Sequence, residues 1–187
     1  MSGFQKFLLR GKVIDREGAR SPVLHGAAAG LIAGIPQVLL TQVEARLMGL
    51  PGSQADIGPR FVQRVSSYLD AQPRAPERWL LAGGFHFGYA AGWGVLYGLL
   101  QRWRPAQPHV GGPLLAALIY GLAFSPWGAA SQTGTERPVE RRPFRETLLH
   151  WTAALSFALS LAYLFARLER WPRPDPLPAV ARAPRGG

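Results

Sequence analysis

Long uncharged runs alternate along the chain with short stretches rich in charge. Four runs contain no Asp, Glu, Lys or Arg, and they are 20 to 23 residues long: 23–43, 79–101, 110–132 and 147–166. A helix of about 20 mostly apolar residues crosses a hydrocarbon layer of roughly 30 Å, because each residue adds about 1.5 Å. The pattern therefore predicts four membrane-spanning helices.

Buried helices of a soluble protein are the competing interpretation of these runs. Such helices keep polar side chains on the face turned to water, so charges recur with a helical period. The runs over 79–101, 110–132 and 147–166 carry no charge on any face. The sequence therefore favours an all-α polytopic membrane protein with a four-transmembrane-helix bundle.

Glycine, proline and flanking charges set the expected ends of the four helices. These helices make up a transmembrane domain over residues 21–170, and they are expected over 22–49, 79–101, 113–131 and 145–168. Pro126 falls inside the third of them, where we expect a bend, because proline interrupts the hydrogen bonding of a helix.

Three further segments lie outside the expected spans. Residues 1–20 are expected to be an N-terminal tail in the cytoplasm or at the membrane surface, and residues 171–187 a disordered tail rich in Pro and Arg. In the first loop, apolar side chains recur at helical spacing at Ile57, Phe61, Val65 and Tyr68. That recurrence predicts a short helix lying in the membrane interface.

Charge changes this picture in two ways. The net charge of +10 would suggest nucleic acid in a soluble protein. Here the basic residues flank the uncharged runs, as side chains that face lipid headgroups do, so the expected partner is the lipid bilayer and not nucleic acid. With four spans, 12 Lys and Arg lie on the side of the termini and 9 on the other, which favours cytoplasmic termini in a bacterial inner membrane.

Glycine recurs every four residues in the first two expected helices. The two rows are Gly26, Gly30 and Gly34, and Gly84, Gly88 and Gly92. Helices in lipid associate by close packing, and small residues allow their backbones to approach. We therefore expect the first two helices to pack tightly and antiparallel through these rows. The alternative is that one row contacts a second copy of the chain.

Polar side chains at membrane depth are costly and are candidates for function. The candidate cluster consists of Gln37, Glu44, His86 and His150. The helical period places Glu44 and Gln37 on one face of the first helix. With four spans, Glu44, His86 and His150 all lie toward the outer half of the bundle, where they can converge.

Three interpretations of this cluster stay open. It can be a structural hydrogen-bond network between helices. It can be a proton-responsive or solute-conducting site, because a histidine beside a carboxylate titrates near neutral pH. It can also be a metal or haem site, but the chain has no cysteine and no HxxxH or ExxH pair, so we expect neither a metal nor a cofactor. Hydrolase motifs are absent as well, and we expect no enzymatic activity.

Four segments of the chain have a recognisable layout. AGLIAGIPQVLLTQVEARLMGLP is a glycine-rich helix that ends in an acid and a proline, and FHFGYAAGWGVLYGLL opens with a histidine. GGPLLAALIYGLAFSPWG has a late proline and glycine, and RETLLHWTAALSFALSLAYLFARL starts with an acid and a histidine. Over residues 22–170 this layout resembles the YagU-like family of bacterial inner-membrane proteins. The family's acid in helix 1 corresponds to Glu44, and its histidines in helices 2 and 4 correspond to His86 and His150.

This resemblance implies a four-helix inner-membrane protein with no known enzymatic activity and a loose link to envelope or acid stress. The family also has a basic residue one turn before the acid and a histidine in helix 3, where this chain has Leu40 and either Phe124 or Ser125. We expect a non-enzymatic protein that supports envelope or pH homeostasis through a small proton-responsive site. The alternative is an accessory transmembrane subunit, with a membrane-protein partner or a second copy of itself.

Overall fold

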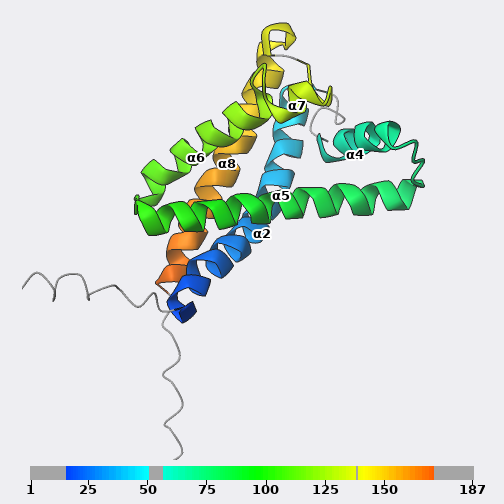
Figure 1. Ribbon diagram of the computed structural model, residues 1–187. Coiled ribbons are helices and arrows are strands. Elements are labelled where there is room, and N and C mark those ends of the chain that lie inside the picture. Colours follow the sequence, from blue (N-terminus) through cyan, green and yellow to red (C-terminus); the bar gives the residue numbers. More distant parts are fainter. Residues whose placement is uncertain (1–15, 51–56, 138, 171–187) are drawn as a thin grey trace, which may run out of the picture.

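The computed structural model describes residues 16–50, 57–137 and 139–170 (Figure 1). The elements in these ranges are α2 (Arg16–Leu47), α4 (Ile57–Tyr68), α5 (Ala75–Trp103), α6 (Pro108–Phe124), α7 (Ala129–Gln132), the 3-10 turn η1 (Val139–Arg141) and α8 (Phe144–Glu169). No strand occurs among the described residues. The first 15 residues of the expected N-terminal tail and the whole expected C-terminal tail, 171–187, lie outside these ranges.

The expected helix bounds differ from the structure by a few residues at several ends, and the difference is largest at two places. Helix α2 begins at Arg16, within the segment predicted as a tail. The helix expected over 113–131 is instead divided, because α6 ends at Phe124 and Ser125 is extended, with ψ 168°. Proline disfavours helical backbone at the residue before it, so Pro126 ends the helix rather than bending it. The helical path resumes in the short α7.

Three helical segments are long and apolar enough to cross a membrane within the described part of the chain. They are Pro22–Leu47, Pro108–Gln132 and Phe144–Glu169, and they define a helical membrane-type protein. Helix α5 is not among them, although residues 79–101 carry no charge. Its six glycines over 83–98, its Tyr and Trp side chains and His86 are less apolar than the aliphatic residues of the other three helices. Length and composition therefore support three membrane-spanning helices, and they do not support a fourth.

Helices α2 and α5 run in opposite directions and cross obliquely with their backbones in contact (Figure 1). A Cβ added to Gly26 would collide with the backbone of Gly94, and one added to Gly30 would collide with the backbone of Ala90. At one end of this row Gly98 lies against the carbonyl group of Pro22. The expected close antiparallel packing of these helices is therefore confirmed, and the first glycine row takes part in it.

The second glycine row was assigned to the wrong face of α5. A Cβ added to Gly84, Gly88 or Gly92 would meet nothing within 4 Å. The residues of α5 that face α2 are instead Ala90, Gly94 and Gly98, which also recur every four residues. Both rows have the small-residue spacing that brings helices together, so spacing alone did not distinguish them.

Helix α8 lies along α2 in the opposite direction and is held to it at both ends. Near one end, Nδ1 of His25 lies 2.6 Å from Oε1 of Glu169. Near the other end, Nη1 of Arg145 donates to the Met48 carbonyl at 3.3 Å. Between them the buried core is made of small and large apolar side chains from α2, α5, α6 and α8, among them Ala33, Tyr97, Ile119, Phe157 and Leu161.

Helix α6 packs against α8, and the contacts set its direction. Near the start of α6, a Cβ on Gly112 would meet Leu159. At its end, the ring of Phe124 stacks on His150, with centroids 4.5 Å apart. Because later residues of α6 meet earlier residues of α8, the two helices are antiparallel, and α6 runs in the same direction as α2.

Candidate functional site

A cavity of about 690 Å³ lies between α2, α4, α5, α6 and α8. Its walls are mostly apolar and aromatic, with rings from Phe61, Phe85, Trp93, Phe124 and Phe157. Few polar side chains reach it, namely Gln37, Thr41, Gln42, His86, Thr135 and His150. Its volume falls in the range of about 300–1,000 Å³ that is usual for sites that take one small molecule.

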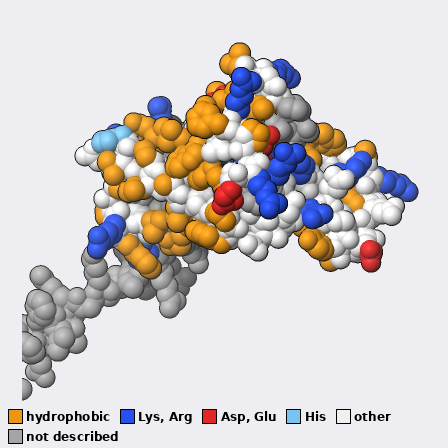
Figure 2. Space-filling model, turned by 90° about the horizontal axis from the view of Figure 1, so that it is seen from above, with side chains coloured by type: hydrophobic (Ala, Val, Ile, Leu, Met, Phe, Trp, Pro, Cys, Tyr) orange, Lys and Arg blue, Asp and Glu red, His pale blue; other side chains and the backbone are white. Residues whose placement is uncertain are grey.

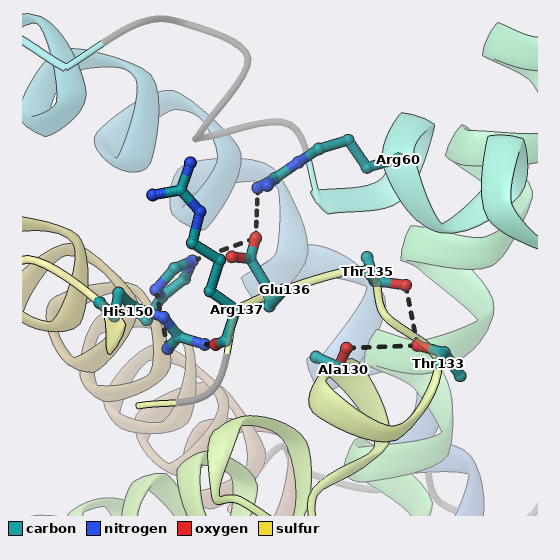
Figure 3. A network of polar contacts seen from close by, with 8 residues as sticks. Arg60, Ala130, Thr133, Thr135, Glu136, Arg137 and His150 are labelled. Carbon is teal, nitrogen blue, oxygen red and sulfur yellow. Dashed lines mark hydrogen bonds and ion pairs between the residues drawn. The ribbon is translucent and has the colours of Figure 1, made fainter. Parts of the chain in front are cut away.

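A buried polar cluster lies beside the cavity, near α4 and α7, and shares His150 with the cavity wall. We call it the arginine–glutamate cluster, and its members are Arg60, Glu136, Arg142 and His150. The Glu136 carboxylate forms an ion pair with Arg60, and its Oε1 lies 3.8 Å from Nε2 of His150 (Figure 3). Only 7% of Glu136 and 3% of His150 are exposed. His150 therefore belongs both to the cluster and to the cavity wall.

A tight turn after α7 carries Glu136 into this position. Gly134 has φ +66°, a left-handed conformation that glycine adopts without strain. The Nε of Arg64 donates to the Thr133 carbonyl at 3.1 Å, and the Glu136 amide donates to the Ala130 carbonyl at 3.0 Å. These bonds fold the loop back onto α7, so the Glu136 side chain points toward α4 and α8 (Figure 3).

Arg142 follows η1 and forms the other side of the cluster. Its side chain is 7% exposed, and Nη2 donates to the Arg137 carbonyl at 2.5 Å. Nη1 lies 3.5 Å from Nδ1 of His150, and the guanidinium lies 5.5 Å from the centroid of the Phe124 ring. Because a guanidinium only donates, this geometry leaves Nε2 of a neutral His150 as the N–H that faces Glu136.

Burial and the neighbouring arginines shift the pKa of Glu136 in opposite directions. Burial raises its pKa above the ordinary value of 4.5, and the positive charges of Arg60 and Arg142 lower it by less. The buried carboxyl of Glu146 adds a smaller upward effect. The result is a pKa above the usual range, so Glu136 takes up a proton more readily than an exposed glutamate does. Such a shifted group beside a cavity is a functional candidate.

The structure separates the four side chains of the predicted cluster. Gln37, His86 and His150 line one cavity, and Glu44 does not. Glu44 instead accepts a hydrogen bond from Thr152 on α8, 2.7 Å long. His86 donates from Nε2 to the Gly34 carbonyl at 3.2 Å, so its partner is the backbone of α2 and neither Glu44 nor His150. The prediction that Glu44, His86 and His150 converge directly is therefore wrong.

Three members of the arginine–glutamate cluster were missed by sequence reasoning. Arg60 and Arg142 were interpreted as charges that set membrane topology, and Glu136 as part of a polar loop. The sequence feature that could have pointed to these residues is the density of charge in GTERPVERRPFRE (134–146), where acids alternate with arginines. Such a segment usually lies in solvent, and only the turn at Gly134 buries part of it.

The end of the molecule that carries α4, α7 and η1 also carries exposed basic side chains. Figure 2 shows basic side chains gathered on this face beside fewer acidic ones. Exposed charged residues of this end are Arg64, Arg137, Glu140, Arg141 and Arg145. Basic side chains in this position suit the phosphates of lipid headgroups.

The fold and this site together define a class, a helical membrane-type protein with a largely apolar cavity beside a cluster of buried charge. No family model, no curated protein and no solved structure matches the chain. The resemblance to the YagU-like family therefore stays a prediction. Among the described residues, no group of three His, Asp or Glu side chains is placed to hold a metal ion.

Proposed function

We propose that this chain is a non-enzymatic, four-span protein of a bacterial inner membrane that responds to protons through the arginine–glutamate cluster. Such a response would serve envelope or pH homeostasis, as the resemblance to the YagU-like family also implies. The observation that carries the proposal is the burial of Glu136 between Arg60 and His150, 3.8 Å from the histidine ring. Protonating Glu136 removes a buried negative charge together with its attraction to the guanidinium groups of Arg60 and Arg142.

The position of the cluster gives protonation a route to the helices. Arg60 comes from α4, Glu136 from the loop after α7, and His150 from α8. The charged and titratable groups that face Glu136 are Arg60, Arg142, Glu146 and His150. These groups belong to separate elements. Because burial disfavours the charged carboxylate more than the arginines favour it, neutralising Glu136 stabilises the packing of α4 and the α7 loop against α8.

Chain direction supports four crossings. Helices α2 and α6 run in the same direction, and α5 connects the end of the first to the start of the second. If α2 and α6 both span the bilayer, the chain between them must return across it. Helix α5 is the described segment placed to do so, since residues 79–101 are uncharged.

Hydrogen–deuterium exchange of the full chain in lipid nanodiscs tests the proton response. From neutral to mildly acidic pH, we expect the protection of residues 129–142 to rise in the wild type after correction for intrinsic rates, because the folded cluster binds a proton more tightly than the opened loop does. Glu136→Gln should give a protection that no longer changes between these pH values. The matched control is Glu140→Gln, because Glu140 is exposed in the same loop. A wild-type pattern in Glu136→Gln would show that the cluster is not the sensor.

The exposed glycine row favours a second candidate, an accessory transmembrane subunit of a larger complex. Gly84, Gly88 and Gly92 face open space on α5, next to exposed Phe87 and Leu96. Small residues flanked by large apolar ones form the surface that another membrane helix packs against. Mild-detergent purification from native membrane should then recover a partner in fixed ratio that Gly88→Leu releases and Gly121→Leu, on α6, retains.

A further inference from the structure

We propose that the cavity is a binding site for one uncharged ring compound that dissolves in the bilayer, and that stacking on aromatic side chains holds this compound. Two observations carry the proposal: the cavity wall has no charge, and a continuous row of aromatic rings follows it. The arginine–glutamate cluster shares only His150 with this wall. The ligand site therefore goes beyond the proposed function and does not rest on it.

The polarity of the wall selects an uncharged occupant. Among the described residues that line the cavity, none is Asp, Glu, Lys or Arg. Polar side chains on the wall, such as Thr41 and His86, already bond within the protein. The Thr41 hydroxyl donates to the Gln37 carbonyl at 2.7 Å, and Nε2 of His86 lies 3.2 Å from the Gly34 carbonyl. An ion in this space would lose its hydration without gaining a charged partner, which is costly. The wall therefore admits neutral, largely apolar molecules.

A continuous row of aromatic rings lines the cavity along α4 and α5. Phe61 of α4 stacks on Phe85 of α5, with ring centroids 4.2 Å apart. Phe85 stacks in turn on Tyr89, with centroids 5.9 Å apart, and Tyr89 meets Trp93 edge to face at the same distance. All four rings belong to the cavity wall. The three rings of α5 recur every four residues, so they share one face of the helix.

Helices α6 and α8 add further rings to the same cavity. Phe124 of α6 stacks on His150 of α8, and Phe157 lies about two turns further along α8. Aromatic rings attract one another beyond the area that they bury. A ring compound is also rigid, so its binding costs less conformational entropy than the ordering of a flexible hydrocarbon chain. Aromatic side chains from four helices therefore favour a ring compound over an acyl chain.

Exposed apolar side chains connect the cavity with the outer surface of the helices. Ile35 and Leu39 of α2 and Leu122 of α6 line the cavity and are also exposed. These residues lie within segments that are long and apolar enough to cross a membrane. A molecule dissolved in the hydrocarbon of the bilayer can therefore reach the cavity without passing through water. Apolar cavities stay dry and take up apolar ring compounds such as benzene.

Fluorescence titration of the full chain in lipid nanodiscs with N-phenyl-1-naphthylamine tests the cavity. This probe is an uncharged ring compound whose emission rises in an apolar site, and empty nanodiscs of the same lipid give the background. We expect a saturable signal above that background. Ala123→Phe should weaken it at least tenfold, because Ala123 lines the cavity and the added ring would occupy part of it. Ala117→Phe is the matched control, since Ala117 is exposed on the same helix and does not line the cavity. Equal loss in both variants, or no saturable signal, would overturn the proposal.

Replacing one ring of the row tests how the compound is held. Phe85→Leu should weaken binding of the probe roughly two- to tenfold, which is the effect of losing one aromatic pair. Phe144→Leu should leave the affinity unchanged, because Phe144 is exposed at the start of α8 and lies outside the cavity. Melting temperatures show which variants are folded, and Tyr89→Leu makes the same test on a more exposed ring of the row. Wild-type affinity in either folded ring variant would contradict stacking.

Competitors separate a ring compound from a hydrocarbon chain and from a charged molecule. We expect methylnaphthalene to displace the probe, whereas hexadecane and palmitic acid should not. Displacement by either chain as readily as by methylnaphthalene would overturn the assignment of a ring compound. Glu136→Gln should bind the probe as the wild type does, because Glu136 does not line the cavity. Binding of the probe without a pH-dependent exchange pattern would remove the proton response and keep this site, and a proton response without binding would do the reverse.

Discussion

At the scale of single residues, the polar side chains Glu44 and His86 each have a partner on a neighbouring helix. Gln37, Glu44, His86 and His150 were chosen because polar groups are costly there. The structure gives Glu44 a hydroxyl from Thr152 and gives His86 a backbone carbonyl. Only His150 meets other ionisable groups, and they come from α4 and from the segment between α7 and α8. Loop arginines and acids are indistinguishable from solvated charges until the loop is folded.

The pH dependence of stability should follow Glu136. Because its pKa is raised in the folded state, that state binds more protons than the unfolded chain between the ordinary carboxyl pKa and the raised one. The free energy of unfolding therefore falls as the pH rises through this window. Melting temperatures of the detergent-solubilised protein measured across acidic to neutral pH should decline in wild type, and the decline should be smaller in Glu136→Gln. Glu140→Gln should keep the wild-type slope.

The hydrogen bond between Thr152 and Glu44 should make a modest contribution to stability. Hydrogen bonds between membrane helices contribute about 0.6 kcal/mol on average and up to about 1.7. Thr152→Val should lower the free energy of unfolding by an amount in this range, measured by denaturation in mixed detergent. Thr147→Val, on the same helix, is the control, and an equal loss in both variants would mean that the Glu44 contact contributes nothing.

At the scale of the elements, two small-residue rows on α5 have different roles. The row that continues from His86 through Ala90, Gly94 and Gly98 faces α2, whereas Gly84 and Gly92 face away. The helical period predicts both rows, and it cannot say which one meets the neighbouring helix. That choice depends on how far α5 is rotated when the backbones of α2 and α5 meet.

A pair of alanine substitutions distinguishes the two rows. Gly94→Ala places a Cβ against the backbone of Gly26, and we expect it to cost about 1–3 kcal/mol of stability, as overpacking does. Gly92→Ala places a Cβ in open space, and it should be neutral or stabilising by up to about 1 kcal/mol, because alanine favours helix more than glycine does. Thermal unfolding of both variants in detergent measures the difference. Equal destabilisation would contradict the observed packing.

At the scale of the whole molecule, the number of crossings depends on α5. Three segments are apolar enough by composition, and the fourth crossing is our proposal, argued from the shared direction of α2 and α6. If α5 spans the bilayer, the residues before and after it lie on opposite sides.

Single cysteines test this directly, since the chain has none of its own. Gln72→Cys and Gln107→Cys flank α5 at exposed positions. We expect a membrane-impermeant maleimide to label one of these two cysteines in sealed right-side-out vesicles and the other in inverted vesicles. Labelling of both from the same side would contradict four spans.

The sequence by itself determined the class of the protein and the identity of its long helices. Uncharged runs of 20 residues or more leave few alternatives to helices in lipid, because an unpaired backbone group is too costly there. It also determined that α2 and α5 pack closely through glycine. Helix α4 was predicted from four apolar positions, and Pro126 was recognised as an interruption, although it ends α6 rather than bending it. These are local properties, fixed by composition and period within a single segment.

The tertiary structure alone decided which face of α5 meets α2, which side chains line the cavity and which charges are buried. Rotation about a helix axis depends on the neighbouring helices, and no periodicity within one segment specifies it. Glu136 is buried because the turn at Gly134 and the bond from Arg64 fold its loop back toward α4 and α8. These contacts join residues 64 and 133, which lie 69 positions apart in the chain. Sequence patterns report neighbours along the chain, whereas the arginine–glutamate cluster depends on neighbours in space.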